Sequence, residues 1–259
     1  MELRLQKLKR FNLIMGFFHL IQGVIMLFLA TTVIEKIAEF QPTIVQFYLT
    51  FNPMTQSLES TSKALFTLPF GILVASFLLI SAVAHGVIVW CSKKYFEDLE
   101  QGINRFRWFE YALSSSIMIV LISTLFGIYD IASLILIFIV NASMNLFGLD
   151  MELLNAGKEK KKVAWGPFVY GSLAGIAPWV AIFLYMFGTG NFDQVPWFVW
   201  AIVITYFVAF NTFPINMILQ YKAVGKWKDY LYGERVYIIL SLAAKSILAW
   251  LVLFGAMQP

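Results

Sequence analysis

The sequence predicts an all-α membrane protein, built as a bundle of seven transmembrane helices. Hydrophobic residues make up 60% of the 259 residues, charged residues make up only 13%, and the charges leave long uncharged segments between them. A soluble domain typically carries about 25% charged residues. The apolar content excludes a disordered or collagen-like chain, and a single cysteine, Cys91, excludes a disulfide scaffold.

Seven segments are long enough to cross a bilayer core, which takes about 20 apolar residues of helix. We expect spans at approximately 11–33, 65–91, 105–128, 131–150, 164–187, 196–221 and 235–257, within one domain that covers 1–259. The first segment imitates a signal peptide, because an apolar run follows a basic start. The run is too long and lacks a small-residue cleavage site, so we expect a retained helix.

Lysine and arginine gather on one side of the predicted bundle. Sixteen of them lie in the N-terminal tail and around the connections after the second, fourth and sixth helices, and only Lys36 and Lys63 lie on the other side. Basic loops stay in the cytoplasm. We therefore expect a multi-pass protein of the cell membrane with the N-terminus cytoplasmic and the C-terminus extracellular. Nucleic-acid binding is not expected. The lysine run at 158–162 should be a solvated loop, with contact to membrane lipid as the alternative.

The connection at 34–63 is the one long loop, and part of it is typical of a β-strand. Residues 43–51 are rich in β-branched and aromatic side chains, and turn-forming residues bound them on both sides. We expect a strand there, or half of a hairpin. An irregular lid or an interfacial segment is the alternative.

Lys245 is an ionisable residue inside the seventh predicted span. It lies ten residues beyond Arg235, which at about 1.5 Å per residue places it about 15 Å deep, near the bilayer midplane. A charge there costs about 2.5–3.5 kcal/mol on insertion scales. Desolvation makes a buried amine a nucleophile toward carbonyl groups, so Lys245 is a functional candidate. A lysine that is ion-paired for structure alone is the alternative.

Glu110 is the natural partner for Lys245, because it is a carboxylate that falls inside an otherwise uncharged helix. Counted from Arg107, Glu110 is shallower than Lys245. The two side chains should meet only if the third helix begins earlier, near Glu100. The alternative is a salt bridge between Glu110 and Arg107 at the cytoplasmic rim.

The two histidines, His19 and His85, lie at similar depth in the cytoplasmic half of the first two helices. Ser81 and Gln22 lie about one turn from them. We expect a proton-accepting polar cluster, with structural histidines as the alternative. Two histidines and one distant cysteine do not supply a ligand set for zinc, so we expect no metal site.

Seven helices with one lysine in the middle of the seventh resemble the retinal-binding rhodopsins. An N-terminus inside the cell, a structured first external loop, RWFEYALSSS at 107–116 and SLAAKSILAW at 241–250 resemble the heliorhodopsin family over essentially the whole chain. The resemblance implies a Schiff base between Lys245 and all-trans retinal, with Glu110 as its counterion and His19 and His85 in a cytoplasmic polar cavity. It places Ser114 and Ser241 near the linkage, and Tyr111, Asn141, Met144 and Phe210 around the chromophore.

The resemblance also implies the function: a photoreceptor, not an enzyme, in which light isomerises the retinal without net ion transport. A light-driven proton pump or light-gated channel is the alternative. Pumping rhodopsins carry a carboxylate eleven residues after the counterion, where this chain has Leu121. A retinal-free transporter or membrane enzyme that uses Lys245 as a charge partner is a third hypothesis. Members of the family form dimers, so we expect a homodimer. A signalling partner at the cytoplasmic loops would be unidentified.

Overall fold

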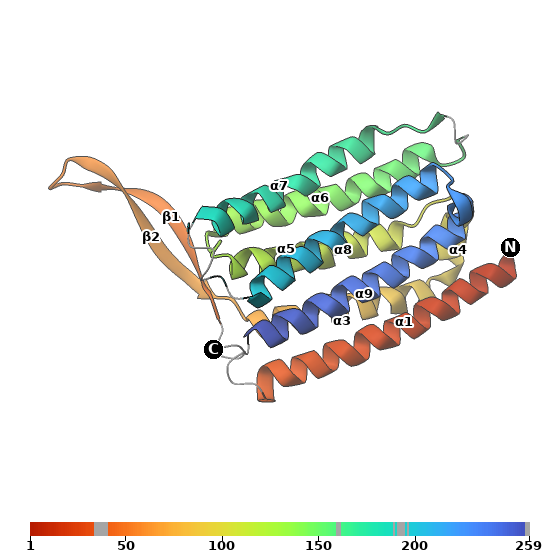
Figure 1. The fold of residues 1–259 in the computed structure, drawn as a ribbon, viewed down its shortest axis with the longest axis horizontal. Helices are drawn as coiled ribbons and strands as arrows, with labels where there is room; N and C mark the ends of the chain where they lie inside the picture. The colour runs from red at the N-terminus through yellow and green to blue at the C-terminus, as the bar shows by residue number, and fades with distance from the viewer. Residues whose placement is uncertain (34–40, 159–161, 189, 191–194, 196, 257–259) are drawn as a thin grey trace.

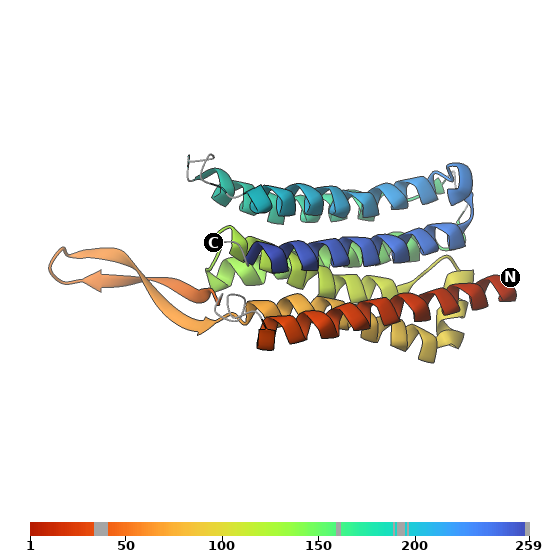
Figure 2. The ribbon, with the colours of Figure 1, turned by 60° about the horizontal axis from the view of Figure 1, so that its bottom comes forward.

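The computed structural model describes residues 1–259 except 34–40, 159–161, 189, 191–194, 196 and 257–259. Within the described part, seven helices are long and apolar enough to cross a membrane. They lie side by side with their axes roughly parallel (Figures 1 and 2). The expected fold class is therefore confirmed: a seven-helix membrane bundle with a small β element in its first connection. The side of the membrane that each end faces stays a prediction.

The longest connection is the one between the first and second spans. The seven spans are α1 (Glu2–Phe28, continued by the π-helical turn η1, Leu29–Val33), α3 (Phe70–Trp90), α5 (Arg105–Leu125), α6 (Ile131–Asn155), α7 (Gly166–Gly188), α8 (Trp197–Tyr221) and α9 (Tyr230–Ala256). We call one end of the bundle the basic end; it carries the N-terminus, helix α4 (Ser92–Glu100), the α6–α7 connection and the short helix η4 (Gly225–Lys228). The opposite end is the hairpin end (Figure 1).

Several helices begin or end at residues other than those expected. Helix α3 begins at Phe70 instead of 65, because residues up to Thr67 belong to a β-strand. Helix α9 begins at Tyr230, five residues earlier than expected, and α1 already begins at Glu2. These helices therefore extend through charged residues, such as Arg4 in α1 and Glu234 in α9, beyond the uncharged segments that were used to place them.

The first connection contains a β-hairpin. Strand β1 (Thr43–Asn52) pairs antiparallel with β2 (Ser57–Thr67), so the expected strand is confirmed and its partner is found. Most of the hairpin extends away from the bundle (Figure 2). Its base is docked, because Ile44 is fully buried and the backbone N–H of Val45 donates to the carbonyl of Tyr129 at 3.0 Å.

Helices α5 and α9 occupy the inside of the bundle. Helix α5 packs against α3 and α6, and α9 packs against α1, α3 and α8. Of the seven spans, α5 has the largest buried share, 61%, and α9 the next, 44%. Charged side chains on these two helices are therefore shielded from lipid by their neighbours.

Helix α5 begins at Arg105 and not near Glu100. A turn through Gly102, at φ 75°, ends α4, and the side chain of Asn104 caps α5 by accepting from the backbone N–H of Arg107 at 3.1 Å. Glu110 and Lys245 nevertheless meet, so the expectation that this requires an earlier helix start is wrong. Side chains on a helix tilt toward its N-terminus, and the long Lys245 side chain thus reaches back toward the basic end.

Replacing Asp130 should destabilise the hairpin end. The Asp130 carboxylate caps α6 by accepting from the backbone N–H of Ser133 at 2.9 Å and from its hydroxyl at 2.8 Å. These hydrogen bonds lower the pKa of Asp130 below its ordinary value. We expect Asp130→Ala to cost about 1 kcal/mol of stability, measured by thermal unfolding in detergent at pH 7. Because the folded-state pKa is depressed, the wild-type advantage should vanish as the pH falls below about 4.

Asp130→Asn is the matched control for this prediction. The amide oxygen can still accept from Ser133, so the variant should keep most of the stability at pH 7 and lose the pH dependence. Equal unfolding temperatures for Asp130→Ala and wild type at pH 7 would show that the cap contributes nothing.

Candidate functional site

A buried ion pair joins three helices at the centre of the bundle. The Nζ of Lys245 on α9 donates to Oε1 of Glu110 on α5 at 2.5 Å and to Oγ of Ser81 on α3 at 2.6 Å. The Ser81 hydroxyl lies 2.6 Å from the same Glu110 oxygen. The Lys245 and Glu110 side chains are only 4% and 9% exposed. Each charge thus has its partner inside the protein, as a membrane interior requires.

Ser81 is the hydroxyl that contacts both charges, and sequence reasoning placed it only in the histidine cluster. Ser114 and Ser241, which the family resemblance places near the lysine, are also buried. They lie one turn from Glu110 and Lys245 along α5 and α9. The signal that could have found Ser81 is its position one turn before His85 on a helix that faces α5.

The basic end holds a second buried ionic cluster that sequence reasoning missed. The guanidinium of Arg107 pairs with the carboxylates of Glu152 on α6 and Glu234 on α9, and all three side chains are at most 5% exposed. Arg107 therefore does not pair with Glu110, which was the alternative for that carboxylate. Both acids sit near helix ends and look like membrane-edge charges in the sequence; only the packing of α5, α6 and α9 brings them together.

Neutral donors complete this cluster. The Trp108 indole N–H donates to Glu152 at 2.7 Å, the Asn104 side-chain N–H donates to Glu234 at 2.7 Å, and the Tyr230 hydroxyl lies 3.3 Å from Glu152. Two carboxylates thus share one guanidinium and several hydrogen-bond donors, which offsets part of the cost of burying them.

The two histidines stack against each other beside the ion pair. Their ring centroids are 5.5 Å apart. Nδ1 of His85 lies 2.9 Å from the Asn12 side-chain oxygen, and the Asn12 amide donates to the Tyr95 hydroxyl at 3.2 Å. Burial raises the pKa of Tyr95, so this phenol stays protonated. Neither ring nitrogen of His19 has a hydrogen-bond partner among the described residues. The hydrogen-bonded side chains of His85, Asn12 and Tyr95 thus form a polar line that runs from the histidines toward the basic end.

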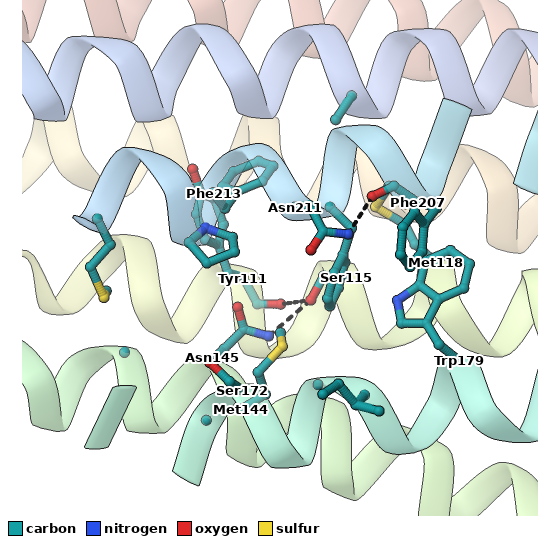
Figure 3. Close-up of a pocket in the computed structure, with 18 of the residues that line it drawn as sticks. Tyr111, Ser115, Met118, Met144, Asn145, Ser172, Trp179, Phe207, Asn211 and Phe213 are labelled. Atoms are coloured by element: carbon teal, nitrogen blue, oxygen red, sulfur yellow. Dashed lines mark hydrogen bonds between the residues drawn. The ribbon is translucent and has the colours of Figure 1, made fainter. Parts of the chain in front are cut away.

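A cavity of about 510 Å³ opens beside Lys245. Its walls come from α5, α6, α7, α8 and α9 (Figure 3), and they include the aromatic or sulfur-containing side chains of Trp108, Tyr111, Met118, Met144, Trp179, Tyr206, Phe207, Phe210, Phe213 and Met217. Pockets that enclose a drug-sized ligand measure about 300–1,000 Å³. The cavity therefore suits a long apolar molecule whose one reactive end meets the amine of Lys245.

Three of the four expected chromophore contacts line this cavity: Tyr111, Met144 and Phe210. Asn141 is not among the lining residues; its side-chain N–H donates to the hydroxyls of Ser115 and Ser116 at 2.8 and 3.0 Å. Asn145, one turn further along α6, takes the position at the wall and donates to Ser115 at 3.0 Å (Figure 3).

No metal-binding arrangement accompanies the cavity: the described residues contain no group of three or more His, Cys, Asp or Glu side chains placed to hold an ion. The arrangement offers one buried primary amine, one carboxylate that stabilises positive charge on it, and an apolar chamber. These groups suit covalent attachment of an apolar carbonyl compound.

A protein-family model described as Heliorhodopsin matches residues 8–257 of the chain. No individual curated protein matches the chain significantly. The match covers most of the first span, the other six spans, the hairpin, the Lys245–Glu110 pair and the Arg107 cluster.

Gly148 allows the close approach that shapes one wall of the cavity. A Cβ at this position would lie 2.3 Å from the Trp108 ring. Gly148→Ala should displace Trp108 and cost about 1–3 kcal/mol of stability, measured by thermal unfolding in detergent. Gly86→Ala, on α3, is the matched control, because a Cβ there meets nothing within 4 Å. Equal unfolding temperatures for the two variants would contradict this role for Gly148.

Proposed function

This chain belongs to the heliorhodopsin family of retinal-binding, light-sensing membrane proteins, and we propose that Lys245 carries all-trans retinal as a protonated Schiff base with Glu110 as counterion. One observation supports this above all others: the same amine that is bonded to Glu110 and Ser81 also lines the 510 Å³ apolar cavity. Bound retinal supplies absorption of visible light and isomerisation of a double bond. The remaining steps belong to the residues of the chain.

Glu110 and Ser81 keep the Lys245 nitrogen protonated in the dark. A positive charge in a low-dielectric interior keeps its proton only beside an anion, and Glu110 provides that anion at 2.5 Å. The Ser81 hydroxyl holds the carboxylate in place at 2.6 Å. A shift of the nitrogen relative to Glu110 weakens this stabilisation and allows the proton to leave.

His19 and His85 are the proposed destination of that proton. Histidine is the side chain whose charge changes most readily near neutral pH, and the pair lies beside Ser81 on the side of the basic end. The proton then returns to the Lys245 nitrogen by the same route. The change in the bundle is the signal, and no chemical conversion of a substrate is involved.

Net transport is not expected, because no buried carboxylate among the described residues lies between Lys245 and the hairpin end. Leu121, on α5, is fully buried among apolar residues where a pump would carry its donor. The buried carboxylates Asp98, Glu152 and Glu234 lie at the basic end, where Asp98 pairs with Arg105 and the two glutamates pair with Arg107. A proton pump or a light-gated channel remains the second candidate, since the polar line from His85 through Asn12 to Tyr95 leads toward that same end.

The basic end is the proposed cytoplasmic face. It carries the N-terminus and the connections that contain sixteen of the lysines and arginines, and the positive-inside rule assigns such a face to the cytoplasm. From the family resemblance we also infer a homodimer and a signalling partner on the cytoplasmic loops, whose identity is open.

The function is tested by replacing the lysine. Lys245→Ala should form no visible pigment with all-trans retinal, while Lys63→Ala, an exposed lysine on β2, should form it normally. The double variant Lys245→Ala/Glu110→Gln removes both charges, so no unpaired buried carboxylate remains to destabilise the bundle. Thermal unfolding of this variant shows whether the helices still assemble. A covalent pigment in a folded Lys245→Ala protein would refute the assignment.

The absence of transport is a second expected result. Illuminated cells that express the protein should show no sustained pH change in unbuffered medium. His19→Ala and His85→Ala should change the lifetime of the deprotonated state, followed by flash photolysis, by about tenfold or more, in line with the contribution of a positioned proton acceptor. A steady light-driven proton flux that a protonophore abolishes would show that the protein is a pump and would contradict the proposed sensor function.

A further inference from the structure

Trp108 on α5 is held by α6 at two edges of its ring. The indole N–H donates to Glu152 at 2.7 Å. The six-membered part of the ring lies over Gly148, where an added Cβ would come within 2.3, 2.5 and 2.7 Å of three ring carbons. Residues 148 and 152 are one turn apart and therefore share a face of α6. A carboxylate and a missing side chain thus determine both the position and the rotation of the Trp108 ring.

The Trp108 ring also forms part of the wall of the chamber beside Lys245. It is 6% exposed and packs edge-on against Tyr111, a second lining residue, with ring centroids 6.1 Å apart. Dispersion contacts weaken steeply with distance, so that a gap of about 0.5–1 Å already loses a quarter to a half of the attraction. A small displacement of Trp108 therefore changes how tightly the chamber can hold an apolar molecule.

Glu152 is not itself among the lining residues of the chamber. Its Oε1 pairs with the Arg107 guanidinium and lies 3.3 Å from the Tyr230 hydroxyl. Its Oε2 accepts from the backbone N–H of Asn104 at 2.8 Å and from Trp108. The carboxylate is thus anchored to the first turn of α5, and the side chain that carries its influence to the chamber is Trp108.

We propose that Glu152 is a positioning residue of the chromophore site, which acts on bound retinal through the ring of Trp108. The inference rests on the proposed photoreceptor function and adds a residue to its site. A hydrogen bond to a carboxylate is roughly twice as strong as one between neutral groups, and a buried N–H without a partner is costly. Without Glu152 the Trp108 ring must therefore turn to find another acceptor, and the chamber wall turns with it.

The hydrogen bond is tested first on the apoprotein, by NMR of the indole N–H groups in nanodiscs. The chain contains eight tryptophans, and Trp108→Phe identifies the resonance of Trp108 by its loss. In Glu152→Ala this resonance should shift upfield, because the N–H loses its acceptor. The remaining indole resonances should keep their positions, which shows that the bundle is folded. An unmoved Trp108 resonance in Glu152→Ala would overturn the proposal.

Glu234→Ala is the matched control. It removes the other carboxylate of the same cluster and also leaves Arg107 with a single partner. Glu234 accepts from the Asn104 side chain rather than from Trp108. The Trp108 resonance should therefore stay in place. An equal shift in Glu234→Ala would show that the charge of the cluster, and not the hydrogen bond from Trp108, is what matters, and would overturn the proposal.

The effect on the chromophore site is tested by a double-mutant cycle after all-trans retinal is added. Glu152→Ala should displace the absorption maximum and slow pigment formation in the wild-type background, and should have little further effect in Trp108→Phe. The ratio of the two rate effects should be at least about threefold, as for residues in direct contact. Equal effects in both backgrounds would show that Glu152 acts without Trp108 and would overturn the proposal.

Gly148→Ala tests the same ring with Glu152 intact, in case Glu152→Ala does not fold. The added Cβ should shift both the Trp108 resonance and the absorption maximum, whereas Gly86→Ala should shift neither. A wild-type spectrum for the Gly148→Ala pigment would overturn the proposal. A colourless wild type whose Trp108 resonance still depends on Glu152 would refute the photoreceptor function alone. A coloured wild type whose resonance and absorption ignore Glu152 would refute the inference alone.

Discussion

The buried pair of Lys245 and Glu110 is the interaction on which the rest of the structure depends. A lysine near the centre of a membrane needs an anion beside it, and α5 delivers one at 2.5 Å while α3 adds the Ser81 hydroxyl. Removing one partner of such a pair typically costs about 3–5 kcal/mol. The need for this ion pair fixes how α3, α5 and α9 face one another. Helices α6, α7 and α8 then enclose the apolar chamber together with α5 and α9.

Helix α5 carries both buried ionic groups on consecutive turns. Arg107 belongs to the cluster with Glu152 and Glu234, and Glu110 belongs to the pair with Lys245. Trp108, between them in sequence, touches the first cluster through its indole N–H and the chamber through its ring. A change in the chamber therefore has a short physical route to the basic end.

Much of this arrangement is predictable from the sequence, because a membrane imposes strict rules on charge and length. The seven spans follow from uncharged segments, the strand at 43–51 follows from its β-branched and aromatic residues, and Lys245 is recognised as a candidate because it is a charge inside a span. The Arg107 cluster does not follow, since Glu152 and Glu234 stand near helix ends, where charges are usually solvated. Whether Asn141 or Asn145 faces the cavity depends on the rotation of α6 about its axis, which two asparagines one turn apart do not determine.

The most direct test of the central claim is a pH titration of the visible absorption band in wild type and Glu110→Gln pigments. Glu100→Gln, which neutralises an exposed carboxylate at the end of α4, is the control. If Glu110 stabilises the protonated Lys245 linkage, the titration midpoint of Glu110→Gln should fall by about 1–3 pH units relative to wild type, and that of Glu100→Gln should not move. An unchanged midpoint in Glu110→Gln would contradict the account, because another anion would then be the counterion.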